Sequence, residues 1–341
     1  MNGVFAIDKP TDKSSASCVG DLQALFTKSP IFRDHLDQVI AVNKSQNPKK
    51  FHRKKFQNPK VKIGHGGTLD PMATGVMVLG LGSGTKQLSN YLGNTVKVYE
   101  AVALLGSATT SYDSEGEVLV KTVNEEAHKS LTKEKIEAVV AKFSGKLKQT
   151  PPLYSALKMN GKPLYEYARS GEPLPKEIQP RDIEIKEIEL LNVSWDHEYN
   201  HPKKEATEEQ KLVSNSLNQL CKPEVRPEDV AASADPQTTI GKAEETDEHS
   251  VKKVKLSDGS SANIINVRDP IIHFRVTVSS GTYIRSLIHD IGLALGTTAH
   301  MTKLVRLRQS NWELGKNVFS YEDFFKHEEA YWGKALEKCL D

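Results

Sequence analysis

The sequence predicts an α+β protein with a mixed sheet rather than a doubly wound parallel sheet. Apolar stretches of strand length are separated by glycine and proline turns, and two further segments have strong helical periodicity. Strands and helices alternate irregularly, and no βαβ unit of ~30 residues repeats along the chain, as a doubly wound sheet would require.

Four strands are predicted from apolar runs and alternation. The first strand is ended by a turn at Pro10, and the second is punctuated by glycines. In the third, Tyr99 and alternate residues up to Leu105 share one face, while Val98 and its alternates share the other. The four strands are residues 4–7 (VFAI), 76–82 (VMVLGLG), 96–106 (VKVYEAVALLG) and 271–278 (IIHFRVTV).

Two amphipathic helices are predicted. In residues 132–145, four apolar residues beginning at Ile136 recur at i, i+3, i+4 and i+7, and Gly145 is expected to end the helix. Residues 284–295 repeat this spacing, and Gly296 is expected to end the second helix.

The charges are unevenly distributed, although 46 Lys and Arg residues nearly balance 44 Asp and Glu residues. Residues 28–60 form a basic insertion, and no acidic residue occurs between Lys44 and Lys62. Residues 200–268 form an acidic insertion of low complexity. Both are poor in aromatic and β-branched residues, so we expect solvated, mobile segments. The basic insertion either screens the phosphates of a polyanion or is only a solvated loop.

The rest of the chain is long enough for one well-buried catalytic domain. This domain is expected to comprise residues 1–27, 61–199 and 269–320, followed by a helical C-terminal tail at residues 321–341. No apolar run approaches the ~18 residues of a membrane span. The N-terminus also lacks the basic and apolar regions of a secretory signal.

The sequence predicts neither a metal site nor a nucleotide cofactor. The three cysteines are far apart and lack metal-ligand spacing. The glycine-rich GLGSGTK at residues 80–86 fails the P-loop pattern, because Thr85 precedes Lys86 and no Ser or Thr follows the lysine. It also lacks the third glycine of the dinucleotide fingerprint.

The densest candidate for chemistry is GHGGTLDPMATG at residues 64–75. Its glycines allow unusual backbone angles and the close approach of another chain, and His65 stands among them. Asp70 precedes Pro71, which favours an extended backbone and holds the carboxylate away from a helix. This carboxylate is a candidate nucleophile or base. The alternative is an Asp-Pro turn that only connects two strands.

A candidate partner for this carboxylate lies in SSGTYIRSLIHDIG at residues 279–292. Thr282 is expected to cap the helix, and Arg285 lies off its apolar stripe, where it can point into a cleft. A guanidinium matches a carboxylate through two parallel hydrogen bonds and would keep Asp70 ionised. The alternative is an exposed arginine at the start of a helix.

Residues 149–171 interleave aromatic rings with positive charges, which suits stacking on nucleic acid and contacts to its phosphates. Tyrosines that are half-buried in an ordinary core are the competing interpretation. The residues concerned are Tyr154, Lys158, Lys162, Tyr165, Tyr167 and Arg169.

Together these segments resemble the TruB family of tRNA pseudouridine synthases, most closely its fungal branch, which modifies uridine 55 in the T-arm. The resemblance runs from DKP at residues 8–10 to KLVRLR at residues 303–308 and covers nearly the whole chain outside the insertions. It implies the pseudouridine synthase fold, with a mixed, largely antiparallel sheet flanked by helices. We expect no complete C-terminal PUA domain, because few residues follow Arg308. The matching motifs include KIGHGGTLDPMATGVMVLGLGSGTKQLSNYL, KVYEA, KQTPPLYSALKMNGKPLYEYAR and SSGTYIRSLIHDIG.

The resemblance also implies roles for individual residues. Asp70 matches the catalytic nucleophile, and Arg285 matches the arginine paired with it. Tyr99 matches the tyrosine that stacks on the target base and takes the proton from C5. The other matches bind substrate: Tyr283 and Leu304 line the uridine pocket, His65 stabilises the flipped-out RNA, and Lys86 contacts phosphate or supports the structure.

The implied reaction breaks the bond between ribose C1′ and uracil N1 and rejoins the base through C5, so no cofactor is expected. The implied partner is the T-stem-loop of tRNA, and messenger RNAs with a similar stem-loop stay an open question. We expect a monomer in the nucleus and mitochondrion, or in the cytoplasm, with VKKVK at residues 251–255 as a candidate import signal. Two other functions stay open, namely a non-catalytic tRNA-folding chaperone and a guide-RNA-dependent rRNA pseudouridine synthase of the dyskerin type.

Overall fold

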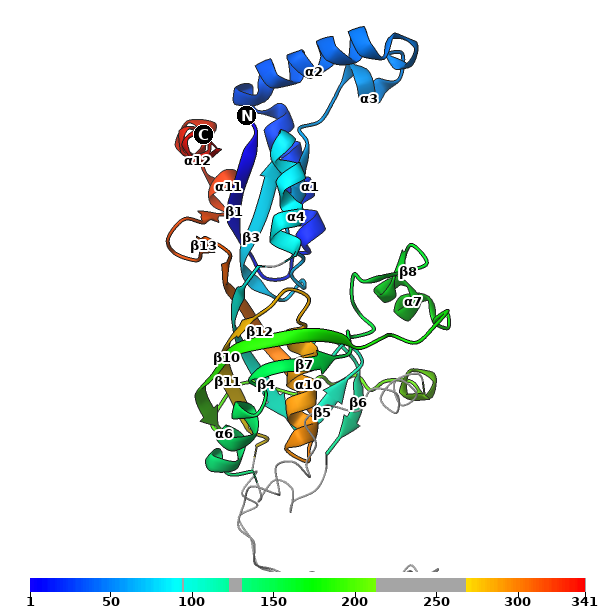
Figure 1. Cartoon of the computed structure of the whole chain (residues 1–341), viewed down its shortest axis with the longest axis vertical. Coiled ribbons are helices and arrows are strands. Elements are labelled where there is room, and N and C mark those ends of the chain that lie inside the picture. The colour runs from blue at the N-terminus through cyan, green and yellow to red at the C-terminus, as the bar shows by residue number, and fades with distance from the viewer. Residues whose placement is uncertain (94, 123–130, 213–267, 341) are drawn as a thin grey trace, which may run out of the picture.

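The computed structural model describes residues 1–93, 95–122, 131–212 and 268–340. Its centre is a sheet of ten strands, which runs through the length of the molecule (Figure 1). The strands are β1 (Gly3–Lys9), β2 (Ile63–His65), β3 (Thr74–Leu81), β4 (Lys97–Leu105), β7 (Gly145–Gln149), β10 (Arg181–Ser194), β11 (Ile271–Val278), β12 (Ala299–Gln309), β13 (Trp312–Glu313) and β14 (Phe319–Ser320). Their order is β14-β1-β3-β12-β4-β11-β10-β7, and β13 pairs with β12 and β2 with β3.

The sheet is mixed and largely antiparallel, which confirms the predicted fold class. The β1–β14 and β3–β12 pairs are parallel, and the other pairs in the described part of the sheet are antiparallel. Two small hairpins lie outside it, formed by β5 (Ser107–Thr109) with β6 (Val118–Lys121) and by β8 (Lys158–Met159) with β9 (Lys162–Pro163).

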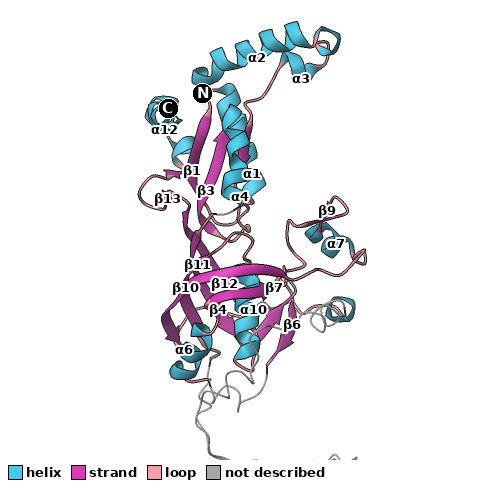
Figure 2. Ribbon diagram, in the orientation of Figure 1, coloured by secondary structure: helices cyan, strands magenta, loops and turns pink. Residues whose placement is uncertain are grey.

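Helices cover both ends of the sheet (Figure 2). Helix α1 contacts β2 and α12 contacts β1 at one end, whereas α10 packs on β12 and α6 on β10 at the other. The helices are α1 (Ser15–Lys28), α2 (Arg33–Gln46), α3 (Lys54–Gln57), α4 (Ser89–Leu92), α6 (Lys133–Ala141), α7 (Leu164–Ser170), α10 (Ile284–Ala294), α11 (Asp323–Lys326) and α12 (Glu329–Leu340). Among the described residues, no helix is both long and apolar enough to span a bilayer.

All four predicted strands and both predicted helices are present. The predicted faces of β4 are also confirmed, because Tyr99 and Leu105 join the main core, while Val102 and Leu104 pack on the opposite side. Helix α6 ends at Ala141, four residues before the expected stop, because Gly145 begins β7.

The N-cap prediction for α10 is wrong. Tyr283 occupies the N-cap without a side-chain hydrogen bond, and the Thr282 hydroxyl donates instead to the carbonyl of Ser279 at 3.0 Å. The prediction for the other end is confirmed, since the helix ends at Ala294 and Gly296 follows in a left-handed conformation with φ 78°.

The basic insertion contains helices that its composition did not indicate. Helix α2 does carry apolar residues at helical spacing, namely Leu36, Val39 and Ile40, although none of its residues is buried. Phe32, just before α2, is buried and stacks on Phe26 of α1 with ring centroids 5.0 Å apart. The expected mobility of this segment stays a prediction.

The acidic insertion is described only at its two ends. The backbone N–H of Ala206 donates to the carbonyl of Val118 at 2.8 Å, which ties the start of the insertion to β6. Residues 213–267, with the candidate import signal at 251–255, lie outside the described residues. The C-terminal tail forms α11 and α12, and Trp332 and Leu336 of α12 are buried in the main core.

Candidate active site

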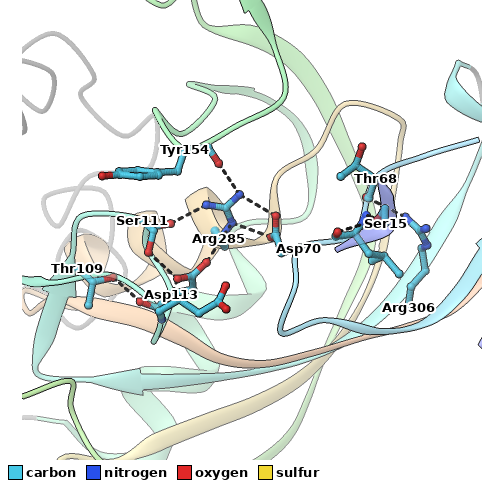
Figure 3. A network of polar contacts seen from close by, with 11 residues as sticks. Ser15, Thr68, Asp70, Thr109, Ser111, Asp113, Tyr154, Arg285 and Arg306 are labelled. Atoms are coloured by element: carbon cyan, nitrogen blue, oxygen red, sulfur yellow. Dashed lines mark hydrogen bonds and ion pairs between the residues drawn. The ribbon is translucent and has the colours of Figure 1, made fainter. Parts of the chain in front are cut away.

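Asp70 and Arg285 are 215 residues apart in sequence and form a two-point ion pair (Figure 3). The guanidinium Nε is 2.9 Å from Asp70 Oδ2, and Nη2 donates to Asp70 Oδ1 at 3.0 Å. This is the fork-to-fork geometry in which arginine holds a carboxylate most strongly. The predicted pairing of these two residues is therefore present in the structure.

Arg285 is buried, with 5% of its surface exposed, so the alternative of an exposed helix-start arginine is wrong. The core packing of Ile284 and Ile288 turns the guanidinium of the first helical turn toward Asp70. The guanidinium also donates from Nη1 to the carbonyl of Ser111 at 2.7 Å and from Nη2 to that of Tyr154 at 2.8 Å. Rotation of this side chain would break all of these bonds.

Asp113 is a second carboxylate at the site, which the sequence analysis missed. Its Oδ2 lies 3.7 Å from Arg285 Nε, and its Oδ1 accepts from the Ser111 hydroxyl at 2.5 Å and from the Glu115 N–H at 3.1 Å. Burial raises the pKa of Asp113, and the charge of Arg285 opposes this effect. The local sequence SYDSEG is typical of a surface turn, so only the neighbouring Tyr112, with φ 63°, marks its special backbone.

The N-terminal segment holds the loop that carries Asp70. The Ser15 hydroxyl donates to the carbonyl of Leu69 at 2.9 Å and accepts from the Leu69 N–H at 2.8 Å. The fully buried Lys9 ammonium donates to the carbonyl of Pro71 at 2.9 Å. Burial lowers the pKa of Lys9. The residues on either side of Asp70 are thus held by hydrogen bonds, while the Asp70 side chain itself is 28% exposed.

Strand β12 holds the same loop from the other side. Arg306, with 1% of its surface exposed, donates from Nη2 to the Gly67 carbonyl at 3.2 Å and from Nε to the Val76 carbonyl at 2.6 Å. Gln309 Nε2 donates to the carbonyl of Gly66 at 2.7 Å. A Cβ on Gly66 would lie 2.8 Å from the Cβ of Tyr91, so a glycine is required where these chains approach.

Tyr99 and Leu304 lie on adjacent strands behind the loop. Leu304 pairs with Ala101, and Arg306 pairs with Tyr99. Tyr99 and Leu304 are each 6% exposed, and the Tyr99 hydroxyl is 3.5 Å from Arg306 Nη1. Arg306 therefore connects Tyr99 to the loop of Asp70.

The remaining predicted site residues lie at different depths. Tyr283 is partly buried, and its N–H donates to Gln149 Oε1 at 2.8 Å. His65 is partly buried in β2, and burial together with the charge of Arg306 lowers its pKa. Lys86 is exposed in the 3-10 helix Gly82–Leu88, and no described contact joins it to Asp70 or Arg285.

The buried-core interpretation is confirmed for one tyrosine of residues 149–171, and the nucleic-acid interpretation stays a prediction. Tyr167 is buried in a small separate core with Met159 and Leu164, and Lys162 lies over its ring at 4.4 Å. Tyr154 is only partly buried, and its carbonyl accepts from Arg285, so this segment reaches the site.

The arrangement can present one accessible carboxylate in a fixed orientation. Both oxygens of Asp70 are held by a guanidinium, and the flanking backbone is fixed by buried donors, so the group is suited to act as a nucleophile or a base. Within the described ranges, no group of three or more His, Cys, Asp or Glu side chains has an arrangement that could hold a metal ion.

The chain is similar to known proteins over its whole length. Residues 53–209 match the N-terminal domain of the TruB family of pseudouridylate synthases, and residues 285–341 match the C-terminal domain of tRNA pseudouridylate synthase B. The chain is 41% identical to tRNA pseudouridine synthase 4 of Saccharomyces cerevisiae, with 100% of this chain and 85% of the yeast protein covered. It is 36% identical to tRNA pseudouridine synthase 4 of Schizosaccharomyces pombe, with 94% and 82% covered.

A solved structure has a similar fold. A chain in the crystal structure of a Cbf5-Nop10-Gar1 complex matches with a TM-score of 0.50 and 21% identity. The match covers 99% of this chain and 57% of that chain, so this protein spans a little over half the length of the solved one. At this identity the likeness concerns the fold alone.

Proposed function

Because the chain belongs to the TruB family of pseudouridine synthases, we propose that it isomerises uridine 55 in the T-arm of tRNA to pseudouridine. Its relatives over the whole chain are named tRNA pseudouridine synthases, and the chain is an enzyme of this class, an isomerase. The observation that carries the proposal is the buried Arg285 that clamps the accessible carboxylate of Asp70.

Asp70 is proposed as the nucleophile. The target uridine is flipped out of the folded T-loop, because its atoms are unreachable inside a stacked loop. Attack by the ionised carboxylate, at ribose C1′ or at the uracil ring, allows the C1′–N1 bond to break. The base turns and a C1′–C5 bond forms, while the bond that Asp70 made in its attack breaks and regenerates the carboxylate. N1 takes up a proton and C5 loses one. Atoms and electrons balance without a donor or an acceptor.

Arg285 is proposed to orient Asp70 and to balance the charge of its carboxylate. The guanidinium is fixed by hydrogen bonds to the carbonyls of Ser111 and Tyr154. A nucleophile held in one orientation before substrate arrives loses less entropy on the way to the transition state.

Tyr99 is proposed to stack on the flipped base and to accept the proton from C5, with Leu304 and Tyr283 lining the pocket. Tyr99 and Leu304 are adjacent to Arg306, which also holds the loop before Asp70. Because Tyr99 is 6% exposed, placing a base against its ring requires neighbouring side chains to move when the uridine enters. His65 is proposed to support the flipped-out RNA, and the exposed Lys86 to contact a phosphate.

The proposed substrate element is the T-stem-loop of tRNA, and we propose that similar stem-loops in messenger RNA are also substrates.

We also propose that the chain acts as a monomer, since Asp70, Asp113 and Arg285 all come from one chain. Light scattering of the purified protein at assay concentrations tests the oligomeric state.

The decisive experiment incubates the purified protein with an unmodified tRNA transcript and no other factor, and then maps pseudouridine. We expect modification at position 55 alone. Asp70→Asn should abolish it and leave tRNA affinity within about twofold, because the amide keeps the shape and removes the nucleophile. Asp182→Asn, which changes an exposed aspartate of β10, is the matched control and should be fully active.

Each alternative function gives a different result. A wild-type protein that binds and refolds tRNA but makes no pseudouridine would indicate a chaperone. A protein that modifies RNA only after a guide RNA is added would indicate the guided class. Activity that survives Asp70→Asn would remove Asp70 from the role of nucleophile.

A further inference from the structure

A dense group of unpaired positive charges lies far from the Asp70–Arg285 pair. We define the basic arm as residues 44–62, in which every basic side chain is exposed and there is no acidic residue. Among the described residues, none of these side chains forms an ion pair, whereas some exposed cations elsewhere do, such as Arg275 with Glu100 at 2.6 Å. The basic residues are Lys44, Lys49, Lys50, Arg53, Lys54, Lys55, Lys60 and Lys62.

Apart from Val61 at its base, the basic arm has no buried residue, so packing in the core does not explain its composition. Helices α2 and α3 have no buried residue, and they project from the end of the molecule that carries α1 and α12 (Figures 1 and 2). Asn43 Nδ2 donates to the carbonyl of Phe56 at 3.2 Å, which holds the two helices together.

The base of the basic arm is fixed to the domain. Val61 is fully buried, its carbonyl accepts from Gln23 Nε2 at 2.9 Å, and its N–H donates to the Thr27 hydroxyl at 3.1 Å. The Lys62 carbonyl accepts from the Gly82 N–H at 2.8 Å. The charges are therefore carried on a projection with a defined origin.

The basic arm lies about one strand length from the site. Ile63, just after the arm, pairs with Leu81 at one end of β3, while Asp70 precedes Thr74 at the other end. Eight residues of strand at ~3.3 Å each span about 25 Å. A single flipped uridine does not bridge this distance, so any RNA on the arm is a different part of the molecule bound at Asp70.

We propose that the basic arm is a second RNA-binding surface, which binds backbone phosphates of the tRNA body outside the T-arm. This inference rests on the proposed function, because the uridine at Asp70 sets where the rest of the tRNA extends. Exposed lysines bind backbone phosphates by charge, and such contacts do not read bases. Such contacts make affinity steeply dependent on salt, by about 0.9 in the log–log slope per phosphate of a duplex.

The test replaces five cations of the arm, Lys49, Lys50, Arg53, Lys54 and Lys55, by glutamine in the full-length chain. The matched control replaces five exposed lysines elsewhere, Lys133, Lys146, Lys186, Lys334 and Lys338, by glutamine and changes the net charge equally. Unchanged melting temperatures of both variants establish that they fold. Affinity is measured against salt for an intact unmodified tRNA and for an isolated T-arm stem-loop.

For intact tRNA, the arm variant should bind at least about tenfold more weakly near 0.1 M salt, with a salt slope smaller by about 3. For the isolated stem-loop, the arm variant should match the wild type in affinity and in pseudouridine formation. The control variant should match the wild type in affinity and in salt slope on both RNAs.

Three results would overturn the inference. The first is an unchanged salt slope of the arm variant on intact tRNA. The second is an equal loss of affinity of the arm variant for intact tRNA and for the stem-loop. The third is an equal loss of affinity in the control variant. Failure of the proposed function is distinguishable, because the wild type would then form no pseudouridine on the stem-loop, whatever the arm does to binding.

Discussion

Asp70 and Asp113 share the Nε of Arg285, which is 2.9 Å from the first carboxylate and 3.7 Å from the second. The side chain of Asp113 is 4% exposed, against 28% for Asp70. The buried carboxylate of Asp113 and the carbonyls of Ser111 and Tyr154 thus hold the guanidinium in place. The more exposed carboxylate of Asp70 remains accessible to a substrate.

Arg285→Lys should therefore impair chemistry more than binding. An ammonium is a point charge and cannot make two parallel bonds to Asp70 while also serving two carbonyls and Asp113. We expect the single-turnover rate to fall about 100-fold or more, which corresponds to ~3 kcal/mol in the barrier, with little change in tRNA affinity. Arg275→Lys, at an exposed pair with Glu100, is the control. A rate within about threefold of wild type would contradict the assigned role of the guanidinium.

Arg306→Met should destabilise the protein and slow catalysis. The buried guanidinium donates to carbonyls of Gly67 and Val76, and methionine would leave these acceptors without partners. We expect the free energy of unfolding to fall by about 3 kcal/mol and the single-turnover rate to fall as the loop before Asp70 loosens. Urea unfolding and single-turnover assays measure both. The exposed Arg308 on the same strand is the control, and equal unfolding midpoints for the two methionine variants would refute this prediction.

Arg306 also shows how far the sequence alone predicts this site. Strands such as β4 and helices such as α10 were predictable because apolar periodicity is a local property of the chain. KLVRLR contains two arginines, and one is fully buried while the other is exposed. Which one turns inward depends on the pairing of β12 with β4, including a register shift between Arg306 and Arg308, and that pairing is a long-range property.

Asp113 was missed for a related reason. SYDSEG has the composition of a solvent-exposed turn, and its aspartate is buried only because the turn packs under Arg285, which is 172 positions further along the chain. Asp70 and Arg285 were paired at the sequence level from charge complementarity and a family resemblance. Ser15 and Lys9, the donors that fix the loop around Asp70, had no local signal, because a serine in a helix start and a lysine before a proline are common.

Two glycine substitutions should have effects of opposite sign. A Cβ on Gly75, where φ is 98°, would lie 2.3 Å from the carbonyl oxygen of Arg306, so Gly75→Ala must disturb the parallel pairing of β3 with β12. We expect a loss of about 3 kcal/mol or more of unfolding free energy. Gly20 lies inside α1 with open space around it, so Gly20→Ala should add about 0.5–1 kcal/mol. Thermal unfolding compares both variants, and a stable Gly75→Ala protein would refute the close approach of the two strands.

His300 should make stability fall as the pH falls. It is fully buried in β12, and its Nδ1 donates to the carbonyl of Ser107 at 3.1 Å. Burial lowers the pKa of His300 to about 4, from about 6.5 in the unfolded chain. Below pH 6.5 the unfolded chain therefore binds a proton that the folded chain does not, so the contribution is fully present above pH 6.5 and is lost toward pH 4.

His300→Asn isolates this contribution, because the asparagine amide keeps a donor near the position of Nδ1 and does not titrate. The wild type should lose about 2 kcal/mol of unfolding free energy between pH 7 and pH 5 beyond what the variant loses. The difference between the two proteins is the measured quantity, since His289 is also buried and its lowered pKa of about 4 affects both equally. Urea unfolding at pH 7, 6 and 5 gives this difference. Parallel pH profiles would mean that His300 reaches solvent and takes up its proton in the folded protein.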